Sequence, residues 1–113
     1  MPHIVIEHSA ELSERINLPA LAKALHLSLA EQETVVRKDI KTRTIAVQNT
    51  IVGEDSDKDL FIHVVLKLLE GRDEILRGKM AKALYRIISS HIVDIECSVS
   101  VDTVEMNKAI YCK

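Results

Sequence analysis

The pattern of apolar and polar residues changes period several times and divides the chain into elements. Residues 3–6 form a short apolar run that predicts a strand, and the polar residues 7–16 allow only a short helical turn. Between residues 18 and 29, leucines recur three and four positions apart, which is typical of one buried helical face. Asn17 is the expected cap of this helix, and Pro19 falls in its first turn, where a missing N–H costs nothing.

The next segments have the patterns of strands and of the turn between them. The β-branched residues 40–51 predict a long strand, and residues 53–59 predict an acidic turn that begins with glycine. This turn is similar in composition to a calcium loop but lacks the required glycine and glutamate, so we reject a calcium site. Residues 60–69 are almost continuously apolar, which predicts a strand buried on both faces, or on one face and an oligomer interface.

The rest of the chain predicts a second helix and a fourth strand. Asp73 is the expected cap of a helix over residues 74–92, with a buried stripe that begins at Ile75. Residues 98–106 alternate again and predict a strand, and residues 107–113 predict a short tail.

These elements occur in the order β-α-β twice, as a pseudo-repeat of roughly residues 1–52 and 58–106 within a single domain of residues 1–113. Two such units place both helices on one face of a four-stranded sheet, so we expect an α/β (α+β) two-layer fold. The other face of the sheet then needs a cover, and self-association is the natural one.

Composition excludes several classes of function. At 113 residues, 47% hydrophobic and 28% charged, the chain is expected to fold rather than to be disordered. Few aromatic residues (3%) and a net charge of −2 argue against nucleic-acid binding. No apolar run approaches the roughly 20 residues of a membrane span, and the N-terminus lacks a secretory pattern. Cys97 and Cys112 lack metal-ligand spacing, so we expect reduced thiols in a cytoplasmic protein.

Pro2 is the first candidate for chemistry. If Met1 is removed, the nitrogen of Pro2 becomes a free secondary amine at the head of a strand. Burial and nearby cations disfavour the charged form of an amine and so make it a better base near neutral pH. Lys41 and Arg43 project from the same side of their predicted strand, where they form an anion site if that face is covered and a solvated surface if it is not.

Five segments occur together in an order and spacing that point to a known family. They are Met-Pro-His-Ile-Val-Ile-Glu at residues 1–7, Leu-Pro-Ala-Leu at 18–21, Ile-Lys-Thr-Arg at 40–43, Phe-Ile-His-Val-Val-Leu-Lys at 61–67 and Gly-Arg at 71–72. In the order and spacing of these five segments, the chain resembles the 5-carboxymethyl-2-hydroxymuconate isomerase family of the tautomerase superfamily. The resemblance implies a tautomerase-like fold and a homotrimer with active sites near subunit boundaries. It also implies that the enzyme needs no cofactor and no metal.

The same resemblance implies a reaction. The enzyme would be an isomerase of the keto–enol tautomerase type, acting on an unsaturated 2-oxo or 2-hydroxy dicarboxylate in aromatic compound catabolism. Pro2 would be the catalytic base. Lys41, Arg43 and Arg72 would bind the substrate carboxylates, polarise the 2-oxo or enol oxygen, and keep the proline neutral.

The chain departs from the family pattern at three places. Lys41 stands where the family pattern has arginine, which removes a bidentate donor for a carboxylate. The loop near Gly53 and the C-terminal segment are also shorter. Two alternatives therefore stay open: a tautomerase of another enol or 2-oxo acid, and a non-catalytic oligomeric α/β module.

Overall fold

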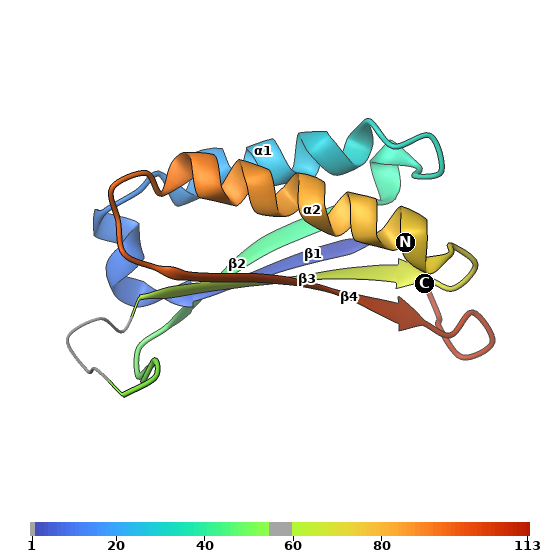
Figure 1. The fold of residues 1–113 in the computed structure, drawn as a ribbon. Coiled ribbons are helices and arrows are strands. Elements are labelled where there is room, and N and C mark those ends of the chain that lie inside the picture. The colour runs from blue at the N-terminus through green and yellow to red at the C-terminus, as the bar shows by residue number, and fades with distance from the viewer. Residues whose placement is uncertain (1, 55–59) are drawn as a thin grey trace.

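The computed structural model describes residues 2–54 and 60–113, which build a four-stranded sheet with two helices on one face (Figure 1). The strands are β1 (His3–Ser9), β2 (Lys41–Val47), β3 (Phe61–Leu69) and β4 (Ser98–Met106). The helices are α1 (Leu18–Ala30) and α2 (Glu74–His91), with short 3-10 turns η1 (Ala10–Glu14) and η2 (Arg37–Asp39). The strand order is β2-β1-β3-β4. The expected two-layer fold is confirmed.

The two β-α-β units meet at the centre of the sheet. Strand β1 runs parallel to β2, β3 runs parallel to β4, and the central pair β1–β3 is antiparallel. Residues 62, 64, 66 and 68 of β3 are buried beneath the helices, and the residues between them are only partly buried on the other face. Strand β3 therefore has one core face and one half-covered face, because successive side chains of a strand point to opposite sides.

Both helices begin at the caps that the sequence predicts. The side chain of Asn17 accepts a hydrogen bond from Ala20 N at 3.0 Å, and that of Asp73 accepts one from Leu76 N at 2.8 Å. The core faces of the helices contain Leu21, Leu25, Leu29, Met80, Leu84 and Ile88. The prediction that Ile75 is buried is wrong, since its side chain is 73% exposed. The buried stripe passes through Leu76, and an adjacent residue is turned by about 100° on a helix.

Three segments meet at one end of the sheet: the α1–β2 connector, the β3–α2 connector and the C-terminal residues 107–113. This end holds the starts of β1 and β2 and the ends of β3 and β4, because β3 and β4 run opposite to the first pair. Figure 1 shows both chain ends here. The amide of Lys41 donates to the carbonyl of Pro2 at 3.0 Å, and the amide of Glu70 donates to that of Met106 at 3.0 Å. Residues that are distant in sequence are thereby held close together.

The turn after β2 is described only in part. Gly53 has a φ of +64°, a backbone conformation that favours glycine, and it lies in a turn with Glu54. The remainder of the predicted acidic turn, with the rejected calcium loop, lies outside the described residues, as does Met1. Among the helices that the structure describes, none is long and apolar enough to cross a membrane.

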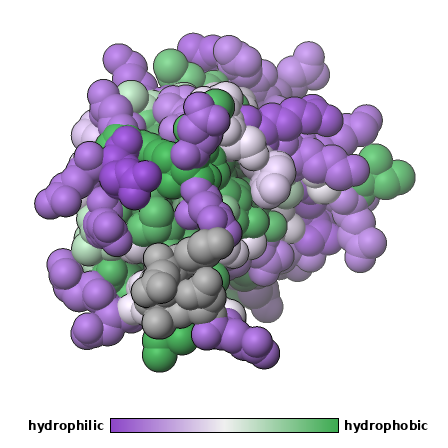
Figure 2. All heavy atoms as spheres, turned by 60° about the vertical axis from the view of Figure 1, so that its left-hand side comes forward, coloured by the Kyte–Doolittle hydropathy of each residue, from purple (hydrophilic) through white to green (hydrophobic). Residues whose placement is uncertain are grey.

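A single protomer leaves apolar surface exposed. On the sheet face away from the helices, Ile45 is 45% and Val104 is 41% exposed, and Val5 and Val65 pair at its centre. Figure 2, which brings forward the end of the molecule away from Pro2, also shows apolar side chains gathered between polar ones. The uncovered face thus carries exposed apolar residues on both edge strands, among charged residues such as Arg43 and Lys67.

Candidate active site

A cavity of about 270 Å³ opens at the end of the sheet where these three segments meet. Pro2 lies in its wall together with Leu68 and Leu69 at the end of β3. The other lining residues come from the α1–β2 connector, from the β3–α2 connector and from residues 107–113. Parts of the chain that the sequence keeps apart therefore build one site around Pro2.

Pro2 lies in a cavity whose wall contains both apolar and charged residues. The residue is buried, and its carbonyl is fixed by the amide of Lys41. Val35 and Leu68, two buried residues of the core, line the same cavity. Burial of an amine favours its neutral form, which is the form that acts as a base.

Arg72 is the one predicted cation that lines the cavity with Pro2. Its Nε donates to Thr34 Oγ1 at 3.1 Å, and its Nη2 donates to the Thr34 carbonyl at 2.8 Å. A longer bond of 3.4 Å joins Nη1 to the carbonyl of Leu69. These contacts fix the plane of the guanidinium and leave part of its N–H donors for an anionic ligand.

Lys41 and Arg43 lie on the uncovered face of the sheet, and among the described residues neither one lines the cavity. Lys41 comes nearest, since its Nζ donates to the carbonyl of Asp39 at 3.4 Å and Asp39 is a lining residue. Arg43 lies two residues further along β2, where its Nη1 donates to His3 Nδ1 at 3.1 Å. Within one protomer, the structure thus brings Arg72 to Pro2 and leaves Arg43 on another surface.

His3 connects the uncovered face to the C-terminal tail. Arginine can only donate, so Nδ1 of His3 accepts the bond from Arg43, and the proton of the neutral ring then belongs to Nε2. This Nε2 donates to the hydroxyl of Tyr111 at 2.9 Å. Burial, followed by the charges of Arg43, Lys41 and Lys67, lowers the pKa of His3 below its ordinary value of 6.5. The neutral ring is therefore the favoured form.

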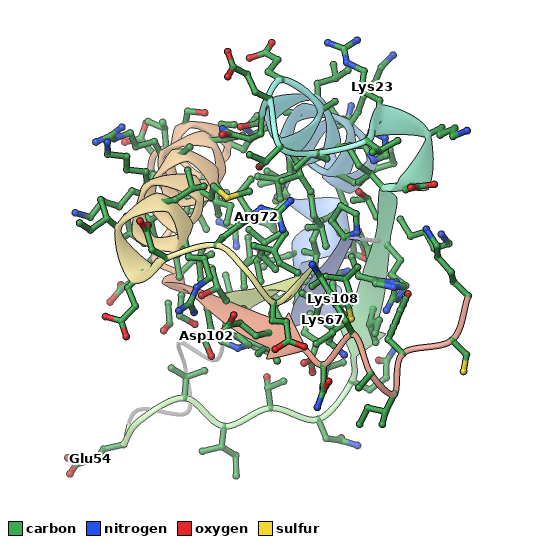
Figure 3. The ribbon with its side chains drawn as sticks, turned by 90° about the vertical axis from the view of Figure 1, so that its right-hand side faces the viewer. Lys23, Glu54, Lys67, Arg72, Asp102 and Lys108 are labelled. Carbon is green, nitrogen blue, oxygen red and sulfur yellow. The ribbon has the colours of Figure 1, made fainter. Side chains whose placement is uncertain are left out.

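Two lysines that sequence reasoning missed also line the cavity. Lys108 and Lys113 belong to the segment 107–113, which carries no periodic pattern from which a position could be read. With Arg72 they place three cationic side chains against two carboxylates, those of Asp39 and Glu70. Figure 3 looks onto this end and labels Arg72 and Lys108 near the middle of the view, whereas Lys23 lies apart on α1. The cavity is thus suited to an anionic ligand beside Pro2.

The repeated β-α-β unit, with both helices on one face of a shared sheet, defines a tautomerase-like α/β protein. The sequence profile of the family described as "5-carboxymethyl-2-hydroxymuconate isomerase" matches residues 2–113. Since this match spans nearly the whole sequence, the chain belongs to the 5-carboxymethyl-2-hydroxymuconate isomerase family of the tautomerase superfamily.

Known proteins agree with this assignment. The chain is 25% identical over 91 residues to the 5-carboxymethyl-2-hydroxymuconate Delta-isomerase of Escherichia coli, which covers 80% of this chain and 72% of that protein. The fold is similar to a 5-carboxymethyl-2-hydroxymuconate isomerase from Deinococcus radiodurans R1, with a TM-score of 0.87, 21% identity, and 99% and 87% of the two chains covered. It is also similar to a fused 4-OT protein solved as a symmetric trimer, with a TM-score of 0.71, 10% identity, and 93% and 87% covered.

Proposed function

We propose that this protein is a cofactor-independent 5-carboxymethyl-2-hydroxymuconate Delta-isomerase in which the amine of Pro2 moves the proton. The observation that carries the proposal is the position of Pro2, buried in a cavity with Arg72, in a chain of this family. The proposal requires removal of Met1, because an acylated proline nitrogen has no lone pair available for a proton.

The reaction is a proton transfer that needs no second reactant. The neutral amine of Pro2 takes the proton of the 2-hydroxyl group of the dienol. The electron pair then moves through the conjugated double bonds to give the 2-oxo group, and the protonated amine returns the proton to a distant carbon. Arg72 stabilises the negative charge that develops on the enolate oxygen or holds a carboxylate next to it. The proline ring restricts the orientation of the nitrogen, so little freedom is lost when the base is aimed.

The proposal includes a homotrimer in which Lys41 and Arg43 meet substrate from across a subunit boundary. The uncovered sheet face carries both cations and also the apolar residues Ile45 and Val104, and one solved protein of the same fold is a symmetric trimer. A neighbouring subunit on this face would take the two cations out of bulk water. In the resulting environment of lower dielectric constant they would attract a carboxylate more strongly.

Substitution of Pro2 tests the proposal. Met1-free protein, verified by intact mass, is assayed spectrophotometrically against a panel of 2-hydroxymuconates and enol-pyruvates. We expect the highest kcat/KM for 5-carboxymethyl-2-hydroxymuconate. We expect Pro2→Ala to lower kcat by about a hundredfold, because the primary amine of alanine is no longer held in the orientation that the proline ring imposes.

Three results would contradict the proposal. Equal kcat in Pro2→Ala and the wild type would show that the proline ring has no part in the mechanism. Turnover of only a phenylpyruvate-type enol would identify a tautomerase with a different substrate, and no turnover of any compound would favour a non-catalytic module.

A further inference from the structure

Residues 107–113 turn back over the cavity after β4 ends. The side chain of Asn107 accepts a hydrogen bond from Ala109 N at 2.9 Å, and its carbonyl accepts one from Ile110 N at 3.2 Å. The amide of Lys108 donates to Glu70 Oε1 at 2.8 Å. The turn is thereby fastened to the β3–α2 connector, next to Arg72.

Lys108 lies close to Gly71 in the β3–α2 connector. Gly71 has a φ of +126°, and a Cβ atom at this position would lie 3.9 Å from Nζ of Lys108, which is an ordinary contact distance. Lys108 lines the same cavity as Arg72, the residue that follows Gly71. Two cations from different segments thus face one ligand space.

Tyr111 anchors residues 107–113 to strand β1 through its contact with His3. Its hydroxyl accepts the hydrogen bond from His3 Nε2 at 2.9 Å, and the two rings meet edge to face at 77° with centroids 6.2 Å apart. His3 is the residue that follows Pro2, so this contact couples the segment to the strand that positions the proline.

Lys113 lines the cavity and has a distant ionic partner there. Its Nζ lies 3.9 Å from Asp39 Oδ2, and the lysine side chain is 57% exposed whereas that of Asp39 is 24% exposed. A partly exposed pair at this distance contributes little to stability, so the lysine can exchange this partner for a ligand carboxylate at small cost.

From these contacts we propose that residues 107–113 form the carboxylate-binding part of the site. Lys108 and Lys113 bind a carboxylate of the substrate, and the bond of Tyr111 to His3 is the positioning contact. This inference rests on the proposed function, because it assigns the anion site to the cavity in which Pro2 is the base. 5-Carboxymethyl-2-hydroxymuconate has more than one carboxylate to bind, and the tail lysines supply a second cationic place beside that of Arg72. Lysine acts as a point charge on a flexible stem, so it tolerates carboxylates at different distances along a chain.

The test compares three single variants and the double lysine variant with a control that removes one lysine elsewhere. Lys108→Ala, Lys113→Ala and Tyr111→Phe are prepared as Met1-free protein, with Lys23→Ala, an exposed lysine on α1, as the control. KM and kcat are measured for 5-carboxymethyl-2-hydroxymuconate, and the affinity for adipate, a saturated dicarboxylate, is measured by calorimetry. We expect KM and the adipate Kd to rise about fivefold in each lysine variant and about twentyfold in the double variant.

In Tyr111→Phe we expect the same rise in KM, with kcat and the unfolding midpoint close to those of the wild type. The adipate measurement does not depend on catalysis, so it separates this inference from the role of Pro2. An unchanged adipate Kd in the double lysine variant would overturn the inference even if Pro2→Ala abolishes turnover. An equal rise in Lys23→Ala would overturn it as well, since the effect would then come from overall charge.

Discussion

At the scale of single residues, the ring of His3, which follows Pro2 in the chain, bonds to two distant side chains. It accepts from Arg43 on one side and donates to Tyr111 on the other, which ties the uncovered face to the tail. A protonated ring cannot accept from Arg43, so protonation breaks the first contact and places a further positive charge among Lys41, Arg43 and Lys67.

The lowered pKa of His3 predicts a pH dependence of stability. Below pH 6.5 the histidine of the unfolded chain binds a proton while that of the folded protein does not, so the unfolded state gains relative stability as the pH falls. The contribution of His3 is fully present above pH 6.5 and is lost progressively as the pH falls toward its lower folded pKa. Denaturant unfolding of the wild type and of His3→Gln across this range measures the effect.

We expect the free energy of unfolding of the wild type to fall more steeply with decreasing pH than that of His3→Gln, because glutamine can accept and donate but does not titrate. Parallel pH profiles of the two proteins would show that His3 keeps its ordinary pKa in the folded state.

At the scale of secondary structure, the start of α2 fixes the connector that carries Arg72. Asp73 caps the helix, and the carbonyl of Arg72 accepts a bond from Arg77 Nε at 3.3 Å. We expect Asp73→Ala to lower the free energy of unfolding by about 1 kcal/mol, because the first turn loses its side-chain acceptor. Asp73→Ser keeps an acceptor, so it should retain most of the stability in the same denaturant titration. Equal losses in both variants would mean that charge rather than capping is responsible.

The sequence predicts the helices and strands well, because the period of the hydrophobic residues and the capping residues of the helices are local signals. The fourth strand has its predicted bounds, and both helices start after Asn17 and Asp73. Strand β2 is shorter than predicted and ends at Val47, where its neighbour β1 ends at Ser9. A strand persists only where a partner supplies its hydrogen bonds, and the pairing depends on tertiary structure.

The candidate site is less visible in the sequence than the fold. Local alternation along the strand correctly predicts that Lys41 and Arg43 project from the same side of β2. Which side faces Pro2 depends on how the strands pair in the sheet, and local alternation does not predict this pairing. Lys108 and Lys113 reach the cavity through a turn at Asn107 and through the contact between Tyr111 and His3, which lie 108 positions apart. Contacts at such separation leave no periodic trace in the sequence.

At the scale of the whole molecule, the proposed homotrimer would form through the uncovered face of the sheet. We expect light scattering to give the mass of three chains. Val65→Glu places a charge at the centre of this face, opposite Val5 and Asp102, and should shift the mass toward one chain. Leu27→Glu makes a similar change on the exposed side of α1 and should leave the trimer intact. A monomeric wild type, or an intact trimer in Val65→Glu, would contradict this arrangement.

The most direct test of Pro2 as the base compares two proteins that differ only at its nitrogen. One is the Met1-free protein, and the other keeps Met1 through a short N-terminal extension, so that its proline nitrogen is an amide. Every side chain of residues 2–113 is the same in both, whereas Pro2→Ala retains an amine and changes only the ring. The measurement is kcat for 5-carboxymethyl-2-hydroxymuconate, with intact mass and adipate affinity as checks on identity and on the cavity. We predict that the extended protein binds adipate and loses turnover by about a hundredfold or more. Equal turnover in the two proteins would contradict a catalytic role for the amine of Pro2.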